Sequence, residues 1–185
     1  MWIWITIIII LAGILVKTPT NNKANRRNHG ILLQFLETIK ILETTTSYEI
    51  FKSRYAFALK LAKDTIKIPQ SNLQTAKTKY LEKYSLNELS FKQESLLANP
   101  ESLSNIYYMA ELETAFFVRL CNKTQDEMSQ LKTNAAKQRR QQKVLEVAKL
   151  IMEQDLNNRA FQVYHKKIIE QLHLIGINSS INYTS

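Results

Sequence analysis

The first candidates for chemistry are acidic and histidine side chains, because these groups bind metals and act as acids and bases. Glu170 and His173 are three residues apart, which puts a carboxylate and an imidazole on adjacent turns of one helix face, as in di-iron bundles. Such a site needs a second Glu-x-x-His pair, and neither of the other two histidines has a glutamate three residues before it. We therefore predict no metal site.

The remaining catalytic candidates are weaker. Cys121 follows Leu120 in an apolar stripe, where a free cysteine behaves as a small buried hydrophobic residue. Glu111 and Glu113 are two residues apart, so on a helix they point to different faces and form no acid–base pair. The three glycines are too widely spaced for a phosphate-binding loop. We predict that the chain is not an enzyme and uses no cofactor.

One stretch, residues 132–143, is strongly basic and contains no acidic residue. Its cations could contact anionic lipid or nucleic-acid phosphate, or they could form a solvated helix face. No aromatic residue lies between Phe117 and Phe161 to stack on bases, so lipid is favoured over nucleic acid, and the solvated face over both. The candidate residues for an anionic-surface contact are Lys132, Lys137, Arg139, Arg140 and Lys143.

A group of aromatic residues follows helical spacing around one arginine. Tyr48, Phe51, Tyr55 and Phe57, with Arg54 between them, give a helix one aromatic face and a cationic edge. This spacing is typical of a core-facing helix, which we favour, and the alternative is a groove for a partner helix.

Composition indicates an ordered, all-α chain. The 185 residues are 45% hydrophobic and 22% charged, with a net charge of +9. Only three glycines and three prolines are present, too few for the frequent turns of a sandwich or barrel. One cysteine excludes an internal disulfide and a cysteine-based zinc site.

Apolar residues recur at helical spacing through residues 30–176. The pattern predicts a helix over 32–42, a second from the N-cap Ser47 to before Pro69, a third over 70–84 and a short one within 86–97. From residue 101 to Gly176, which should end the last helix, it predicts two long helices. We expect a helical bundle or a long helical hairpin, followed by a flexible tail at 177–185.

The first sixteen residues form the strongest pattern in the sequence. Trp2 to Val16 carries no charge and makes a helix of about 22 Å, short of a hydrocarbon core of about 30 Å. Trp2 and Trp4 would lie at one interface and Lys17 at the other. A signal peptide requires a basic segment before its apolar run, and no basic residue precedes this one. The run also lacks the polar face that a helix packed on a protein core would show. We predict a transmembrane anchor at 1–16.

Residues 17–29 are polar and basic, and we expect them to form a flexible linker. Lys17, Lys23, Arg26 and Arg27 follow the anchor, and no acidic residue appears before Glu37. The positive-inside rule therefore predicts an N-terminus outside and a cytoplasmic C-terminal part.

Together these features predict a single-pass, membrane-anchored helical protein that acts in interaction or scaffolding at the cytoplasmic face of a membrane. A protein partner or a homo-oligomer is expected. The alternative, from the net charge of +9, is a membrane-tethered nucleic-acid-binding protein.

Overall fold

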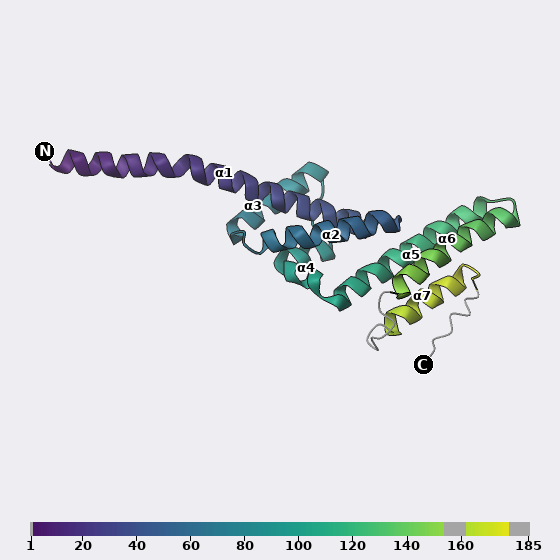
Figure 1. Cartoon of the computed structure of the whole chain (residues 1–185). Helices are drawn as coiled ribbons and strands as arrows, with labels where there is room; N and C mark the ends of the chain where they lie inside the picture. Colours follow the sequence, from purple (N-terminus) through teal and green to yellow (C-terminus); the bar gives the residue numbers. More distant parts are fainter. Residues whose placement is uncertain (1, 154–161, 178–185) are drawn as a thin grey trace. The chain divides into compact units, whose positions relative to one another are not determined.

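The computed structural model describes the backbone of residues 2–153 and 162–177, and the side chains of residues 23–153 and 162–177. These residues form helices and no strand, so the all-α prediction is confirmed (Figure 1). The helices are α1 (Trp2–Thr44), α2 (Tyr48–Thr65), α3 (Gln70–Tyr84), α4 (Phe91–Ala98), η1 (Pro100–Ser104), α5 (Ile106–Gln130), α6 (Asn134–Glu153) and α7 (Gln162–Leu174).

The first helix is longer than the sequence pattern indicated. We expected a flexible linker at 17–29, but α1 runs through this segment without interruption. Lysine, alanine and arginine, which alternate with asparagine here, are good helix formers. Gly30, expected at the start of the ordered part, lies inside α1, where an added Cβ would meet no described atom within 4 Å.

Several helix boundaries lie where local signals predicted them. The hydroxyl of Ser47 accepts the backbone N–H of Ile50 at 3.4 Å at the start of α2. Gly176 has a φ of +77°, and the N–H of Ile177 donates to the carbonyl of Leu172 at 2.9 Å. This is the Schellman arrangement, and it confirms the predicted end of the last helix.

The chain divides into two compact units, each of which takes part of α1 and part of α2. Unit 1 comprises residues 1–37 and 60–100, and unit 2 comprises residues 38–59 and 101–185.

Unit 1 packs a mainly aliphatic core, which also contains the ring of Tyr80, against the second part of α1. Leu32 and Leu36, predicted to share a buried face, are fully buried. The buried residues that surround them are Ile68, Ala76, Tyr80, Leu89 and Leu97. This core joins α1 to α3 and α4.

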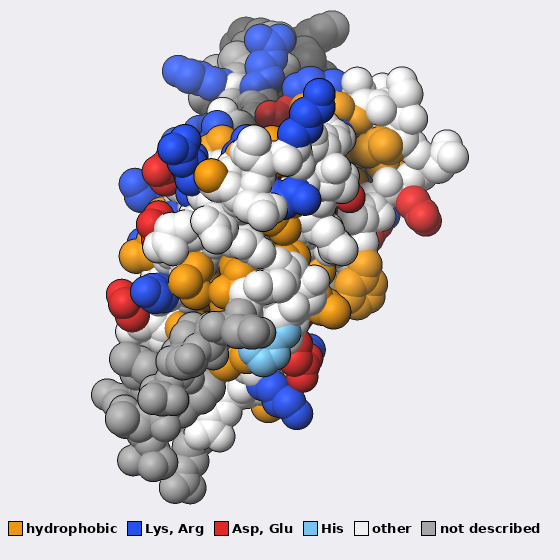
Figure 2. All heavy atoms as spheres, turned by 90° about the vertical axis from the view of Figure 1, so that its right-hand side faces the viewer, with side chains coloured by type: hydrophobic (Ala, Val, Ile, Leu, Met, Phe, Trp, Pro, Cys, Tyr) orange, Lys and Arg blue, Asp and Glu red, His pale blue; other side chains and the backbone are white. Residues whose placement is uncertain are grey.

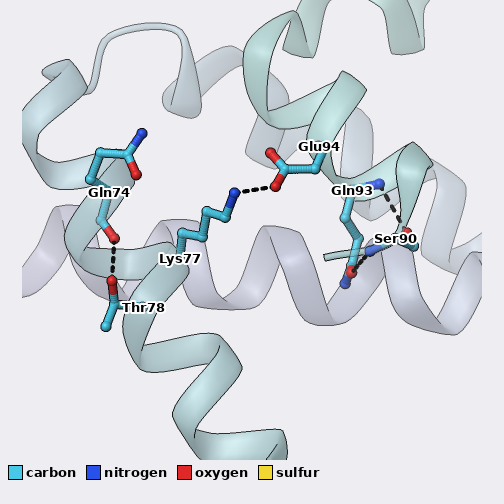
Figure 3. A network of polar contacts seen from close by, with 6 residues as sticks. All are labelled: Gln74, Lys77, Thr78, Ser90, Gln93 and Glu94. Carbon is cyan, nitrogen blue, oxygen red and sulfur yellow. Dashed lines mark hydrogen bonds and ion pairs between the residues drawn. The ribbon is translucent and has the colours of Figure 1, made fainter. Parts of the chain in front are cut away.

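A buried glutamine satisfies polar groups inside unit 1. Gln93 of α4 is 3% exposed, and its Nε2 donates to the carbonyl of Leu36 at 3.0 Å and to the hydroxyl of Tyr80 at 2.8 Å. Its Oε1 accepts the N–H of Ser90 at 3.0 Å, in a reciprocal capping box (Figure 3). Gln93 therefore connects three helices.

In unit 2, α5 packs against α6 and α7, and an aromatic core joins α5 to the first part of α2. The ring centroid of Phe116 lies 5.0 Å from that of Phe51 and 5.7 Å from that of Tyr48. Tyr48 and Phe51 are buried and Tyr55 is half-buried, so the prediction of a core-facing aromatic stripe is confirmed for these three. Phe57 is 37% exposed.

The two long helices predicted over residues 101–176 are instead three α-helices, α5, α6 and α7, among the described residues, because the helix is interrupted at 131–133. Of these, α5 and α6 pack together as a hairpin. A half-buried arginine of α5 also satisfies the end of α1. The guanidinium of Arg119 donates to the carbonyls of Leu42 at 2.6 Å and Thr45 at 3.5 Å.

In the part of the chain whose side chains are described, no helix combines the length and the apolar character that crossing a membrane requires. The predicted anchor at 1–16, with Trp2 and Trp4, and its flanking Lys17 lie outside those residues. The tail predicted at 177–185 also lies outside them, except for Ile177, which is buried.

Candidate functional site

The candidate catalytic residues of α5 and α7 do not form a site. Cys121 is 1% exposed, and burial raises the pKa of its thiol to about 12, so the thiolate that a nucleophile needs is absent near neutral pH. Glu170 and His173 are both exposed on α7. Among the described residues, no three His, Cys, Asp or Glu side chains gather as metal ligands would.

One carboxylate in unit 2 is buried among tyrosines. Glu113 is 4% exposed and accepts the hydroxyl of Tyr48 at 3.4 Å, whereas Glu111 is exposed on another face of α5. Burial, reinforced by the charge of Glu113, raises the pKa of Tyr55 to about 12. The Tyr55 hydroxyl therefore stays protonated and donates a hydrogen bond to the carbonyl of Leu103. This cluster stabilises the packing of α2 on α5.

The basic stretch 132–143 is divided by the fold. Lys132 lies in the turn before α6 and the other four cations lie on α6 itself. All are exposed except Lys137, which is half-buried. The Nη1 of Arg140 forms an ion pair with Glu127 of α5 at 3.3 Å. Basic and acidic side chains also lie close together on the face presented in Figure 2.

Arg140 and Lys143 line a cavity of about 170 Å³, here called the α5–α6 hollow. Its other lining residues are Thr46, Tyr48, Leu120, Lys123, Thr124, Glu127, Val144 and Val147. Glu127 lies 3.9 Å from the ammonium of Lys123, which also donates to the hydroxyl of Thr46 at 3.2 Å. One carboxylate thus neutralises part of the predicted basic surface. Whether the stretch contacts an anionic surface remains a prediction.

A larger cavity, of about 490 Å³, lies in unit 1 between α1 and the end of α2. We call it the α1–α2 hollow, and its lining residues are Lys23, Ala24, Arg27, Asn28, Ile31, Asp64, Lys67 and Ile68. Three cations therefore face one carboxylate. None of these four charged groups has an ion-pair partner among the described side chains.

The sequence indicated only half of this hollow. Lys23 and Arg27 were singled out because they follow the apolar run, but Lys67 and Asp64 were not. Lys67 lies in the turn after α2, where no periodic pattern marks it, and only the packing of this turn against α1 brings it to the others.

No protein family, no curated protein and no solved structure matches this chain.

Proposed function

We propose that the chain is a single-pass membrane protein with its N-terminus outside, and that its helical part, residues 30–176, is an interaction module at the cytoplasmic face. The observation that best supports this proposal is the continuity of α1, a single helix of 43 residues. Its first part holds the uncharged apolar run, and its last part supplies Leu32, Leu36 and Leu42 to buried cores.

The length of α1 fits this division of roles. At 1.5 Å per residue, 43 residues extend for about 65 Å, well beyond a hydrocarbon core of about 30 Å. A bilayer would bury the isoleucine-rich run that water would leave exposed. Lys23, Arg26 and Arg27 follow the run and favour a cytoplasmic location for the rest of the chain.

An exposed face of α2 in unit 2 supports the interaction role. Ile50 is 47% exposed and Phe57 is 37% exposed, and the two lie seven residues apart on one face of the helix, with the exposed Arg54 between them. Aromatic residues and arginine are enriched in protein interfaces.

Membrane insertion can be tested by extraction of the full chain from membranes with alkaline carbonate. We expect the parent to stay in the membrane pellet and the variant Ile8→Lys/Leu11→Lys to be released, because a lysine at the bilayer centre costs about 2.5–3.5 kcal/mol. The control Asn122→Lys/Gln125→Lys adds the same charge at exposed positions and should stay in the pellet. Release of the parent would contradict the proposal.

Topology can be tested with an exposed cysteine, because the buried Cys121 should be silent in the native chain. Asn122→Cys should resist a membrane-impermeant thiol reagent on intact cells and react after permeabilisation. The parent, with Cys121 alone, is the matched control. Labelling of Asn122→Cys on intact cells would reverse the proposed orientation.

Partner binding can be tested by purification in mild detergent. The variant Ile50→Lys/Phe57→Lys should lose proteins that the parent retains, whereas Lys60→Gln/Lys63→Gln, changed at exposed positions of the same helix, should retain them. Identical retention by all three chains would exclude the α2 face as the contact. Nucleic acid that survives high salt would instead support the nucleic-acid-binding alternative.

A further inference from the structure

The α1–α2 hollow places three cations, which have no ion-pair partner among the described side chains, beside apolar side chains. Lys23 and Arg27 are one helical turn apart on α1, and Lys67 reaches the same cavity from the turn after α2. Ile31 and the buried Ile68 form its apolar part. A cavity of about 490 Å³ with this lining offers both a cationic contact and an apolar contact to one ligand.

The position of the hollow along α1 indicates what the ligand is. Lys23 is seven residues beyond Val16, so it lies about 10 Å from the end of the apolar run along the helix axis. The headgroup layer of a bilayer occupies about 5–8 Å beyond the hydrocarbon core. Because the apolar run is shorter than that core, the bilayer thins around it or flanking residues are drawn inward. The aliphatic stem of Lys23 then lets its ammonium reach back from the helix to the headgroup layer.

We infer that the α1–α2 hollow binds the headgroup of an anionic phospholipid, with the phosphate at Lys23, Arg27 and Lys67. This inference rests on the proposed membrane anchor. The guanidinium of Arg27 can hold two phosphate oxygens at once, and the two lysines add point charges.

Asp64 narrows the choice of headgroup. A carboxylate in the hollow repels a bare phosphate monoester but accepts hydrogen bonds from hydroxyl groups. A phosphodiester with a hydroxyl-bearing headgroup, such as glycerol, matches three cations and one acceptor. The half-buried Asn28 supplies a further amide donor and acceptor.

The test uses the full chain in lipid nanodiscs of phosphatidylcholine alone, and in nanodiscs with a third of that lipid replaced by phosphatidylglycerol. Acetylation of individual lysines is followed by mass spectrometry. We expect Lys67 to react about fivefold more slowly in the anionic discs, and the exposed Lys63 of α2 to change much less. Equal rates at Lys67 in both kinds of disc would overturn the lipid site and leave the anchor standing.

A pair of charge-matched variants separates the hollow from general surface attraction. Arg27→Gln should lessen the protection of Lys67, although Lys67 itself is unchanged, whereas Lys63→Gln should preserve it. Equal loss in both variants would mean that the surface charge of the domain, and not the hollow, attracts the lipid.

Two further measurements test whether the bound phosphate comes from a lipid or from solution, and whether binding depends on the membrane anchor. Glycerol phosphate added to neutral discs should protect Lys67 less than phosphatidylglycerol does, and equal protection would assign the hollow to a soluble phosphate. Failure of the parent to enter either kind of disc would show that the anchor is wrong, and with it the lipid site.

Discussion

The two units of the chain differ in the residues that form their cores and in whether the cations of their hollows form ion pairs. Unit 1 has a mainly aliphatic core that includes Tyr80 and is crossed by the hydrogen bonds of Gln93. Its α1–α2 hollow leaves three cations without ion-pair partners among the described residues. Unit 2 has an aromatic core, and in its α5–α6 hollow Glu127 pairs with Arg140 and Lys123. Net positive charge is therefore a poor guide to a binding site, because the fold decides which cations are already neutralised.

The largest expected effect comes from the aromatic core of unit 2. Phe116→Ala removes a fully buried ring that packs against Phe51, and should lower the free energy of unfolding by about 3–5 kcal/mol. Urea unfolding of the detergent-solubilised full chain, followed by circular dichroism, measures this. Phe57→Ala, the same change at a ring that is 37% exposed, should cost much less. Equal losses would mean that the aromatic cluster is not the stabilising core.

The next effect tests the polar core of unit 1. Gln93→Leu leaves the hydroxyl of Tyr80 and the N–H of Ser90 without this partner, and should cost about 1–3 kcal/mol. In the double variant Tyr80→Phe/Gln93→Leu, part of that loss should be recovered, because the hydroxyl that has lost its hydrogen bond to Gln93 is gone as well. Strict additivity of the two changes would show that the two side chains do not interact.

Alkaline pH should weaken unit 2 through Cys121 and two tyrosines. Burial raises the pKa of Cys121 to about 12 from 9.0, and those of Tyr55 and Tyr108 to about 12 from 10.0. The unfolded chain therefore releases these protons first, so the stabilisation is full below pH 9 and is lost as pH rises towards 12. For Cys121 this amounts to about 1–2 kcal/mol by pH 10.

The measurement for this prediction is the urea midpoint of the full chain between pH 7 and pH 10.5. Cys121→Ala lowers stability at every pH because it leaves a cavity, but its midpoint should fall less steeply above pH 9 than that of the parent. Parallel curves for the two chains would contradict the assigned role of the thiol.

The smallest effect compares the two hollows directly. Glu127→Gln removes the partner of Arg140 and Lys123, and should cost about 0.5–1 kcal/mol at low salt, because both pairs are partly exposed and screened by solvent. High salt should abolish the difference from the parent. Asp64→Asn, which breaks no ion pair with a described side chain, should stay within about 0.3 kcal/mol of the parent. An equal, salt-dependent loss in both variants would remove the contrast between the hollows.

Local signals in the sequence predicted the helices α2, α3 and α4 and several helix ends. The spacing of Leu32 and Leu36 predicted a buried face because side chains three to four residues apart lie on one side of a helix. Ser47 and Gly176 predicted boundaries because an N-cap hydroxyl and a positive φ act within a few residues. The linker expected at 17–29 is instead helical, because polar composition alone does not distinguish a loop from the exposed part of a long helix.

The sequence by itself determined the all-α class, the apolar run at 1–16 and the positions of most helices, since each depends on neighbours along the chain. Only the tertiary structure decided which charges meet. Glu127 lies opposite Arg140 because α5 and α6 form a hairpin, and Lys67 joins Lys23 because the turn after α2 packs on α1. Coulomb interactions depend on distance in space, and Lys23 and Lys67, which are 44 positions apart in the sequence, come close only when the chain folds.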